Sequence, residues 1–194
     1  MSINSREKGK RGERQFRDEL RGYGYAARRG QQFSGSPDSP DVVCDALWWI
    51  HFEVKFVENL NIYTAMAQAK RDCGGKVPVV AHRRNFSPWL ITLDADWLFA
   101  SATGLLGGLC HFSTFQGKWL NLRDAVESAR REAGERIPFL VHERNGMRLV
   151  TMECATFFRL LRGDGIGISG AALAKIAKGS EVPANSSAAA PHFQ

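Results

Sequence analysis

The stretch SPDVVCDALWWIHFEVK, residues 39–55, decides the fold. Between residues 48 and 54 every even position is apolar, and successive side chains of a strand point to opposite faces. The pattern therefore predicts a strand whose second face carries Glu53 and Lys55, about 7 Å apart along the strand. The run Val-Val-Cys at 42–44 predicts the partner strand of a hairpin that turns near Asp45.

Asp41 lies just before that partner strand, twelve positions ahead of Glu53 (53 − 41). In a hairpin, one carboxylate from each strand can reach the same gap of metal-ion size, and Lys55 places an ammonium beside it. Magnesium prefers such oxygen ligands and can activate a bound water for attack on phosphorus. These three residues are therefore the minimum equipment for metal-assisted hydrolysis of a phosphodiester.

A helix is predicted over residues 8–21, with Phe16 and Leu20 on its buried stripe. Glu13 lies three and seven positions before them, so it projects from the same face. A carboxylate on an apolar stripe has two explanations. It forms a buried ion pair with a neighbouring arginine, or it is a third acidic group of the hairpin site that a cation would keep ionised.

The positive charge of the chain is local. The 194 residues carry a formal net charge of +6, and residues 6–29 hold nine lysines and arginines against four carboxylates, 9 − 4 = +5. A basic stripe close in sequence to a metal site favours a polyanionic substrate, and nucleic acid is the commonest one. The alternative is a solvated helix face, although the stripe continues beyond the helix into Arg28 and Arg29.

The cysteines and the termini bear on location. The four cysteines show no C-x-x-C spacing and no nearby histidine pair, so we expect small buried hydrophobes in a reducing compartment. The first residues are polar and charged, which argues against a secretory signal. The weakly polar stretch 97–112 is too short to cross a bilayer. We expect a soluble, cytoplasmic protein with no membrane partner, in the host cytoplasm if a phage encodes it.

Segment 30–40 is rich in Gly, Ser, Gln and Pro, which predicts a surface loop. Its Ser34 and Ser36 can hydrogen-bond phosphates, or the loop can be an ordinary connection. Further elements are predicted downstream: helices over 61–73 and 94–100, and strands over 77–82 and 89–93.

An internal duplication follows. LNIYTAMAQAKRDCGGKVPVVAHRRN (60–85) realigns on LNLRDAVESARREAGERIPFLVHERN (120–145) at a constant offset of sixty. The catalytic strand is predicted to be missing from the copy, since Ser113 and Phe115 stand at the positions of Glu53 and Lys55. Ser128 likewise replaces Gln68.

This pattern divides the chain into three parts: a core over 1–102, a partial repeat of residues 60–99 over 103–162, and a low-complexity tail over 163–194 that we expect to be disordered. The partial repeat is a degenerate helix-strand-strand unit without the chemistry. It either extends the sheet or occupies the surface that a second subunit would fill.

His82 and His142 end apolar strands at equivalent positions of the two copies. A His-Asn-His nuclease site would need a second histidine and a different hairpin. Because the histidines occur in both the active copy and the copy without the chemistry, a structural role at the strand end is favoured.

Four segments together resemble the PD-(D/E)xK nuclease superfamily, especially archaeal and phage Holliday-junction resolvases: KGKRGERQFRDEL (8–20), RRGQQFSGSPDSPDVV (28–43), HFEVK (51–55) and QAKRDCGGKVPVVAHRR (68–84). The resemblance covers about the first hundred residues. It implies an α/β, restriction-endonuclease-like core, with an N-terminal helix and a mixed central sheet flanked by helices. It also implies Mg²⁺ or Mn²⁺ dependence and DNA cleavage by water.

By motif position, the resemblance implies that Asp41 and Glu53 bind the metal, joined by Glu13 from the helix, and that Lys55 is the catalytic lysine. These four residues form the candidate catalytic set. Ser34 or Ser36 resembles the loop serine of the family. Small resolvases of this type act as homodimers, so the partial repeat leaves open both the oligomeric state and the selectivity for junctions.

We therefore expect a metal-dependent DNA endonuclease selective for branched or junction DNA. The alternative is a non-catalytic DNA-binding or architectural protein on a nuclease-derived fold. The candidate DNA-binding residues are Lys8, Lys10, Arg11, Arg14, Arg28, Arg29, Ser34, Ser36, Gln68, Arg83 and Arg84.

Overall fold

The computed structural model describes residues 5–30, 39–101, 110–115 and 120–162. The expected tail and the loop serines Ser34 and Ser36 lie outside these residues. The helices are α1 (Ser5–Gly22), α2 (Ile62–Asp72), α3 (Ala95–Ser101), α4 (Leu122–Ala133) and α5 (Cys154–Arg162), with a short 3-10 turn η1 (Asp45–Leu47). The strands are β1 (Ala27–Arg29), β2 (Val42–Cys44), β3 (Ile50–Phe56), β4 (Val77–Arg83), β5 (Leu90–Asp94), β6 (Cys110–Phe115), β7 (Ile137–Arg144) and β8 (Met147–Glu153).

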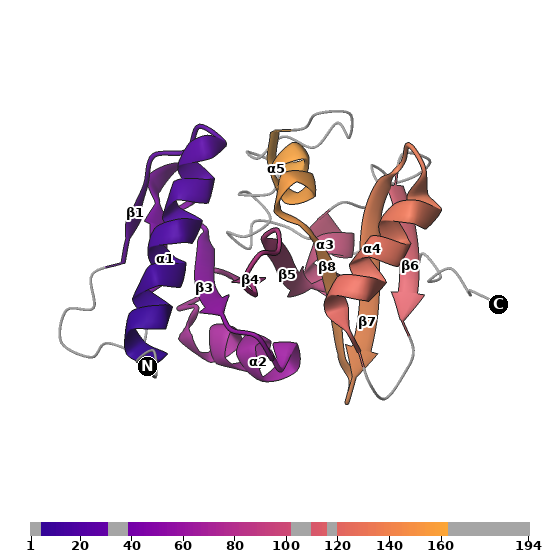
Figure 1. Cartoon of the computed structure of the whole chain (residues 1–194), viewed down its shortest axis with the longest axis horizontal. Coiled ribbons are helices and arrows are strands. Elements are labelled where there is room, and N and C mark those ends of the chain that lie inside the picture. The colour runs from indigo at the N-terminus through magenta and orange to yellow at the C-terminus, as the bar shows by residue number, and fades with distance from the viewer. Residues whose placement is uncertain (1–4, 31–38, 102–109, 116–119, 163–194) are drawn as a thin grey trace.

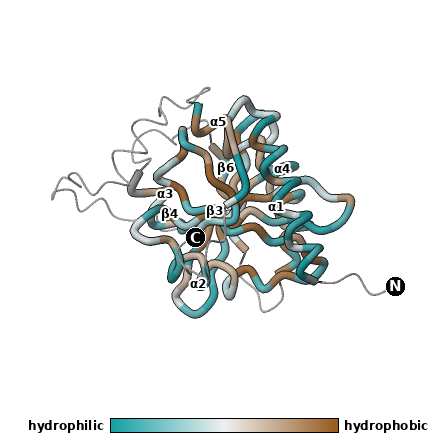
Figure 2. The backbone as a smooth tube through the Cα atoms, turned by 90° about the vertical axis from the view of Figure 1, so that its left-hand side faces the viewer, coloured by the Kyte–Doolittle hydropathy of each residue, from teal (hydrophilic) through white to brown (hydrophobic). Residues whose placement is uncertain are grey.

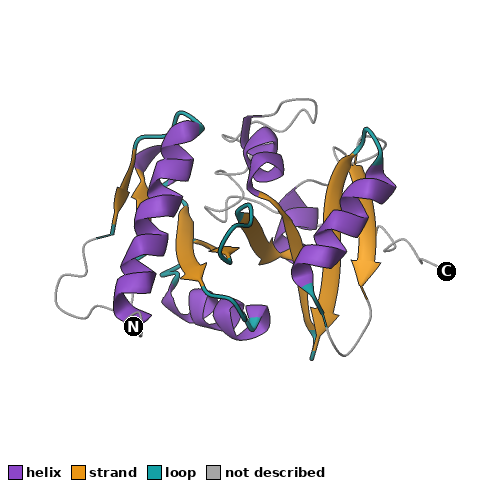
Figure 3. Cartoon of the chain, viewed as in Figure 1, coloured by secondary structure: helices purple, strands orange, loops and turns teal. Residues whose placement is uncertain are grey.

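The eight strands form one mixed sheet in the order β1-β2-β3-β4-β5-β8-β7-β6 (Figures 1 and 3). Residues of α1, α3 and α5 share one apolar cluster on one face of the sheet. Helices α2 and α4 pack in two smaller clusters on the other face. Hydrophobic segments gather in the middle of the molecule and hydrophilic ones outside (Figure 2). The predicted α/β class, with an N-terminal helix and a mixed sheet flanked by helices, is confirmed, and it is compatible with a restriction-endonuclease-like core.

The hairpin around the predicted site is formed by β2 and β3, which pair antiparallel with Val42 opposite Phe52. The strand begins at Ile50, later than predicted, because Asp45–Leu47 turn as a 3-10 helix. Trp48 consequently lies outside the strand and is 48% exposed, whereas Trp49 is buried, the reverse of what the alternation predicted. Packing of helices on both faces also buries the polar face of β3, so that Glu53 is only 7% exposed.

Helix α1 lies on the sheet through its predicted apolar stripe. Phe16 and Leu20 are fully buried, and the Phe16 ring meets Phe52 of β3 at 5.3 Å between centroids. Gly12 permits this close approach, because a Cβ atom at that position would lie 2.6 Å from the Cβ atom of Phe56. The KGKRGER sequence thus combines basic residues with the small residue that seats the helix.

The second repeat is more complete than the sequence indicated. A strand, β6, pairs parallel with β7 at the place where β3 pairs with β4, so the prediction that the copy lacks this strand is wrong. Ser113 and Phe115 replace Glu53 and Lys55, and Thr114 replaces Val54, whereas the His-Phe pair at 51–52 is repeated at 111–112. The strand persists without the chemistry because its pairing with β7 is made by the backbone and does not need the polar side chains. All eight strands belong to one sheet.

Among the described residues, no helix is both long enough and apolar enough to cross a membrane. All four cysteines are free, and Cys44, Cys110 and Cys154 are buried, as predicted for small hydrophobes, whereas Cys73 is only half-buried.

Candidate active site

The backbone holds Asp41 at the end of the β2–β3 hairpin. Its N–H donates to the carbonyl of Phe52 (3.1 Å), and its side-chain Oδ2 accepts from the N–H of Val54 (2.8 Å). Gly30 donates its N–H to the carbonyl of Asp41 (2.8 Å), and a side chain on Gly30 would overlap the Pro40 carbonyl. These three backbone hydrogen bonds fix the position of Asp41. Its carboxylate lies beside Glu53, because Glu53 stands between Phe52 and Val54, the two β3 residues that Asp41 contacts.

Glu53 and Lys55 project from β3 toward α2. The Lys55 Nζ donates to the Glu53 carboxylate (2.5 Å) and to the side-chain oxygen of Gln68 on α2 (3.0 Å). The Lys55 side chain keeps 25% of its surface exposed, against 9% for Glu53. The ammonium is thus positioned by two partners and still reaches solvent, where a substrate would approach.

The electrostatic environment of the Asp41–Glu53 pair shifts the pKa of Asp41. The pKa of Asp41 is raised from 3.8 to about 7, chiefly by burial and also by the nearby negative charges of Glu53 and Glu13. The hydrogen bond from Val54 and the charge of Lys55 lower the pKa but do not compensate. Two adjacent buried carboxylates repel one another unless positive charge lies between them. The donor set is hard oxygen from carboxylates, and it fits a divalent cation such as Mg²⁺ or Mn²⁺.

Glu13 is placed differently from the other two acids. It accepts hydrogen bonds from two nitrogens of the Arg29 guanidinium, one of them at 2.8 Å, so the ion pair predicted as one alternative is present. Its helix packs on the face of β3 opposite to Glu53, although its charge still raises the Asp41 pKa. Within the described ranges, no three His, Cys, Asp or Glu side chains are grouped closely enough to hold a metal ion. The site is therefore a pair of carboxylates with Glu13 and Arg29 alongside.

Several predicted DNA-binding residues surround the ring of Phe56 at the end of β3. Lys8 and Arg11 of α1 lie 5.3 and 5.8 Å from the ring centroid, and Arg83 lies 5.7 Å from it. Arg14 lines the same hollow as Lys8 and Arg11. These side chains from α1 and β4 form one basic surface beside the hairpin.

The remaining predicted cations have other environments. Lys10 pairs with Glu7 on its own helix (3.2 Å), and Arg28 lies 3.7 Å from Asp45. Both pairs are largely exposed, where an ion pair contributes little and exchanges readily for a phosphate. Gln68, predicted to contact DNA, contacts Lys55, which indicates a positioning role in the site.

A groove of about 850 Å³ separates the start of α2 from the start of α4. Arg83 and Arg84 of the first repeat, which the sequence predicts to bind DNA, line it together with three arginines of the second repeat: Arg123, Arg130 and Arg144. Sequence reasoning missed these three because it treated the second repeat as devoid of function. The signal available was the realignment itself, which places Arg144 at the position of Arg84.

His82 and His142 lie in a buried chain of hydrogen bonds. His82 Nε2 meets Thr92 Oγ1 (2.9 Å), Thr92 meets Thr151 (2.7 Å), and Thr151 meets His142 Nε2 (2.8 Å). Burial lowers the pKa of His82 to about 3 and that of His142 to about 4, so both rings are neutral near pH 7. Neutral, buried and hydrogen-bonded rings support the structural interpretation.

Comparison with known proteins finds a similarity over only part of the chain. No family model and no curated protein matches the chain. Among solved structures, the chain is similar to that of a Holliday junction resolvase from the archaeal hyperthermophile Archaeoglobus fulgidus, at 27% identity. The match covers 43% of this chain and 70% of that one, with a TM-score of 0.31.

Proposed function

We propose that this protein is a divalent-metal-dependent DNA endonuclease that acts on branched DNA. One observation carries the proposal: Asp41 is held by backbone hydrogen bonds beside the buried Glu53, with its pKa raised to about 7, and Lys55 stands within reach. A buried acid beside a half-buried one, with too little compensating charge and a partly exposed lysine nearby, is typical of a catalytic rather than a structural site.

Asp41 and Glu53 would hold the metal ion, with Glu13 close enough to add to the negative potential. When bound, Mg²⁺ or Mn²⁺ supplies a Lewis acid and lowers the pKa of a coordinated water. Lys55 orients the attacking water or neutralises the charge that develops on the phosphate in the transition state. Gln68 and Glu53 keep the Lys55 ammonium in place for this task.

Basic residues beside the hairpin would hold the DNA backbone. Lys8, Arg11 and Arg14 of α1 and Arg83 and Arg84 at the end of β4 are the proposed phosphate contacts, joined by Lys10, Arg28 and Arg29. Contacts of this kind position the duplex and weaken steeply with salt. Ser34 and Ser36 stay proposed phosphate ligands on the basis of the sequence.

The test is cleavage of a four-way DNA junction by the full-length protein with Mg²⁺ or Mn²⁺. Asp41→Asn and Glu53→Gln each remove one carboxylate charge at nearly constant volume and should abolish nicking while junction binding persists. Ser113→Ala, at the position that matches Glu53 in the second repeat, is the control and should cleave normally. Full activity in both acid variants, or in EDTA, would contradict the proposal.

The alternative, a non-catalytic DNA-binding or architectural protein, is favoured by the groove lined with arginines from both repeats. It predicts tight, salt-sensitive binding of DNA without cleavage under any divalent ion. A panel of junction, flap, mismatched, duplex and single-stranded substrates discriminates the two functions and also identifies the preferred DNA structure.

A further inference from the structure

The two repeats face one another across an antiparallel seam between β5 and β8. Thr92 lies directly opposite Thr151 in the middle of the ladder, and the two end pairs are Leu90 with Glu153 and Asp94 with Leu149. Thr92 and Thr151 are themselves equivalent residues of the repeats. The seam is therefore self-complementary, as in a dimer with two-fold symmetry, where the same patch of each subunit meets its copy.

The same pseudo-symmetry extends outward from the seam. In the first repeat Val80 pairs with Thr92, and in the second Leu140 pairs with Thr151. At the outer strands Ile50 pairs with Val77, and sixty positions later Cys110 pairs with Ile137. Strands β3, β4 and β5 thus correspond to β6, β7 and β8, and helix α2 corresponds to α4. The molecule contains two copies of one unit in the arrangement of a symmetric dimer (Figure 1).

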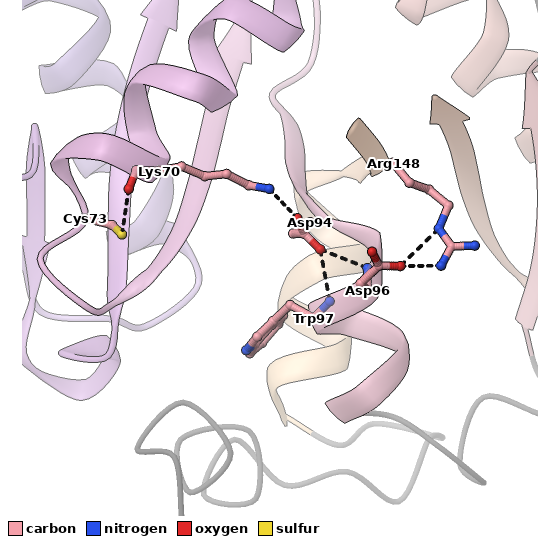
Figure 4. Close-up of polar contacts among 6 residues, drawn as sticks. All are labelled: Lys70, Cys73, Asp94, Asp96, Trp97 and Arg148. Carbon is pink, nitrogen blue, oxygen red and sulfur yellow. Dashed lines mark hydrogen bonds and ion pairs between the residues drawn. The ribbon is translucent and has the colours of Figure 1, made fainter. Parts of the chain in front are cut away.

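Buried polar groups stabilise the pairing of β5 with β8. The chain from His82 through Thr92 and Thr151 to His142 crosses it with equivalent residues from each repeat. Both threonines have no exposed surface, so separation of the repeats would leave buried polar groups unpaired. A second connection lies at the rim, where Arg148 of β8 donates to Asp96 of α3 (3.1 Å from Nε) (Figure 4). The β5 edge of the first repeat is thus occupied within the same chain.

The second repeat has no catalytic set among its described residues. Ser113 of β6 and Ser128 of α4 both donate to Glu132 (2.6 and 3.1 Å), where the first repeat has Glu53, Lys55 and Gln68. In the described part of the sheet, β6 is the last strand, so no counterpart of β2 and Asp41 lies beside it. The second repeat therefore has the strands and the helix of the first repeat but, among its described residues, not the candidate catalytic ones.

The second repeat still contributes to the surface that would hold DNA. The groove of about 850 Å³ is lined by matching segments of the two repeats, around Asn61 and Asn121, at the starts of α2 and α4. Five arginines, two from the first repeat and three from the second, line it together with three glutamates. Arg123 and Arg144 of the second repeat are exposed there.

We infer that the second repeat is a built-in, catalytically silent partner of the first: one molecule holds a DNA junction with both repeats but cuts only one strand. This inference rests on the proposed nuclease function. In a symmetric dimer the two units would each carry a site, and both strands could be cut in one encounter. Here one unit supplies the site and both supply cations for the phosphate backbone.

The test uses a supercoiled plasmid that extrudes a cruciform, with the full-length protein and Mg²⁺ or Mn²⁺. One cut releases the supercoiling, and the cruciform is then reabsorbed before a second molecule binds. We expect nicked circles as the first and main product, together with light scattering at the mass of a single 21.6 kDa chain. Linear plasmid as the first product, or an active dimer in solution, would overturn the inference and leave the nuclease function intact. Absence of cleavage with either ion would overturn the nuclease function, and the inference with it.

A double variant, Arg123→Ala with Arg144→Ala, tests whether the silent repeat holds substrate. Junction binding should weaken, and the slope of log affinity against log salt should fall by about 1 for each arginine that contacts phosphate. The nicked product should stay the same. Arg159→Ala, which removes one exposed arginine of α5 on the other face of the sheet, is the control and should bind as the unchanged protein does. An unchanged slope in the double variant would overturn the assignment of this groove to DNA.

Discussion

The two repeats share a frame and differ in chemistry. Strands β3 and β6 make parallel pairs with β4 and β7 in the same register, and each pairs a proline at the same level (Pro78 and Pro138). The first repeat alone has α1, β1 and β2 packed against its outer strand among the described residues. The comparison teaches that pairing within the sheet preserves a strand, whereas a few polar side chains and one additional hairpin partner make the site.

The largest expected effect concerns Lys55 and its equivalent, Phe115. Lys55→Met removes the ammonium that we propose acts in the transition state, so kcat should fall roughly 10²–10³-fold, as for loss of one stabilising group at a reacting centre. Phe115→Met, the same final residue in the silent repeat, should leave kcat unchanged. Single-turnover cleavage of a junction under saturating enzyme measures both. Equal loss in the two variants would show that the repeats are not chemically distinct.

The second expected effect is the pH dependence of stability, which involves only the first repeat. The Asp41 pKa is about 7 in the folded state against an ordinary 3.8, so between these values the folded state binds more protons than the unfolded state. Asp41 therefore lowers stability as the pH rises from about 4 to 7, and the penalty is complete above pH 7. Asp41→Asn removes this penalty and should be more stable than the unchanged protein at pH 8.

The measurement is thermal unfolding at pH 8 and at pH 4, with and without Mg²⁺. Mg²⁺ should raise the melting temperature of the unchanged protein at pH 8, because the cation compensates the two carboxylates. It should leave Asp41→Asn unaffected, and the two proteins should differ little at pH 4. Equal stabilisation of both by Mg²⁺ would place the cation elsewhere. This readout is independent of cleavage.

The smallest expected effect concerns α1, which only the first repeat has. Gly12→Val adds a side chain whose Cβ atom alone would lie 2.6 Å from the Cβ atom of Phe56. Overpacking of this kind costs about 1–3 kcal/mol. Gly9→Ala, in the same helix with nothing within 4 Å, should stabilise it by up to about 1 kcal/mol. Urea unfolding measures both. If Gly9→Ala were as damaging as Gly12→Val, the effect would belong to the helix itself and not to its contact with β3.

The sequence predicted much of the fold because the patterns involved are local. The helix stripe of Phe16 and Leu20, the helix predicted over 61–73 and the sixty-residue offset are all present in the structure. Two predictions about strands were wrong. Strand β3 begins later than predicted because residues 45–47 form a 3-10 turn, which leaves Trp48 exposed. Strand β6 was not predicted because the second repeat lacks the acidic motif that marks β3.

The candidate site, too, was predicted only in part from the sequence. Spacing along the chain was enough to predict that Asp41, Glu53 and Lys55 lie in one hairpin. It did not decide between the two environments proposed for Glu13, since its partner Arg29 lies sixteen positions away in sequence on another element. The arginines of the second repeat were missed for a similar reason: they reach the groove only because β5 pairs with β8.

By itself, therefore, the sequence determined most of the secondary structure, the duplication and the residues capable of chemistry, because periodicity and spacing act over a few residues. Only the tertiary structure decided that the duplicated units meet as a pseudo-symmetric pair, that Glu13 joins Arg29, and that Asp41 is half-buried with a raised pKa. Those outcomes depend on contacts between residues far apart in the chain, and on the loss of water around them. Neither is encoded in any single stretch of sequence.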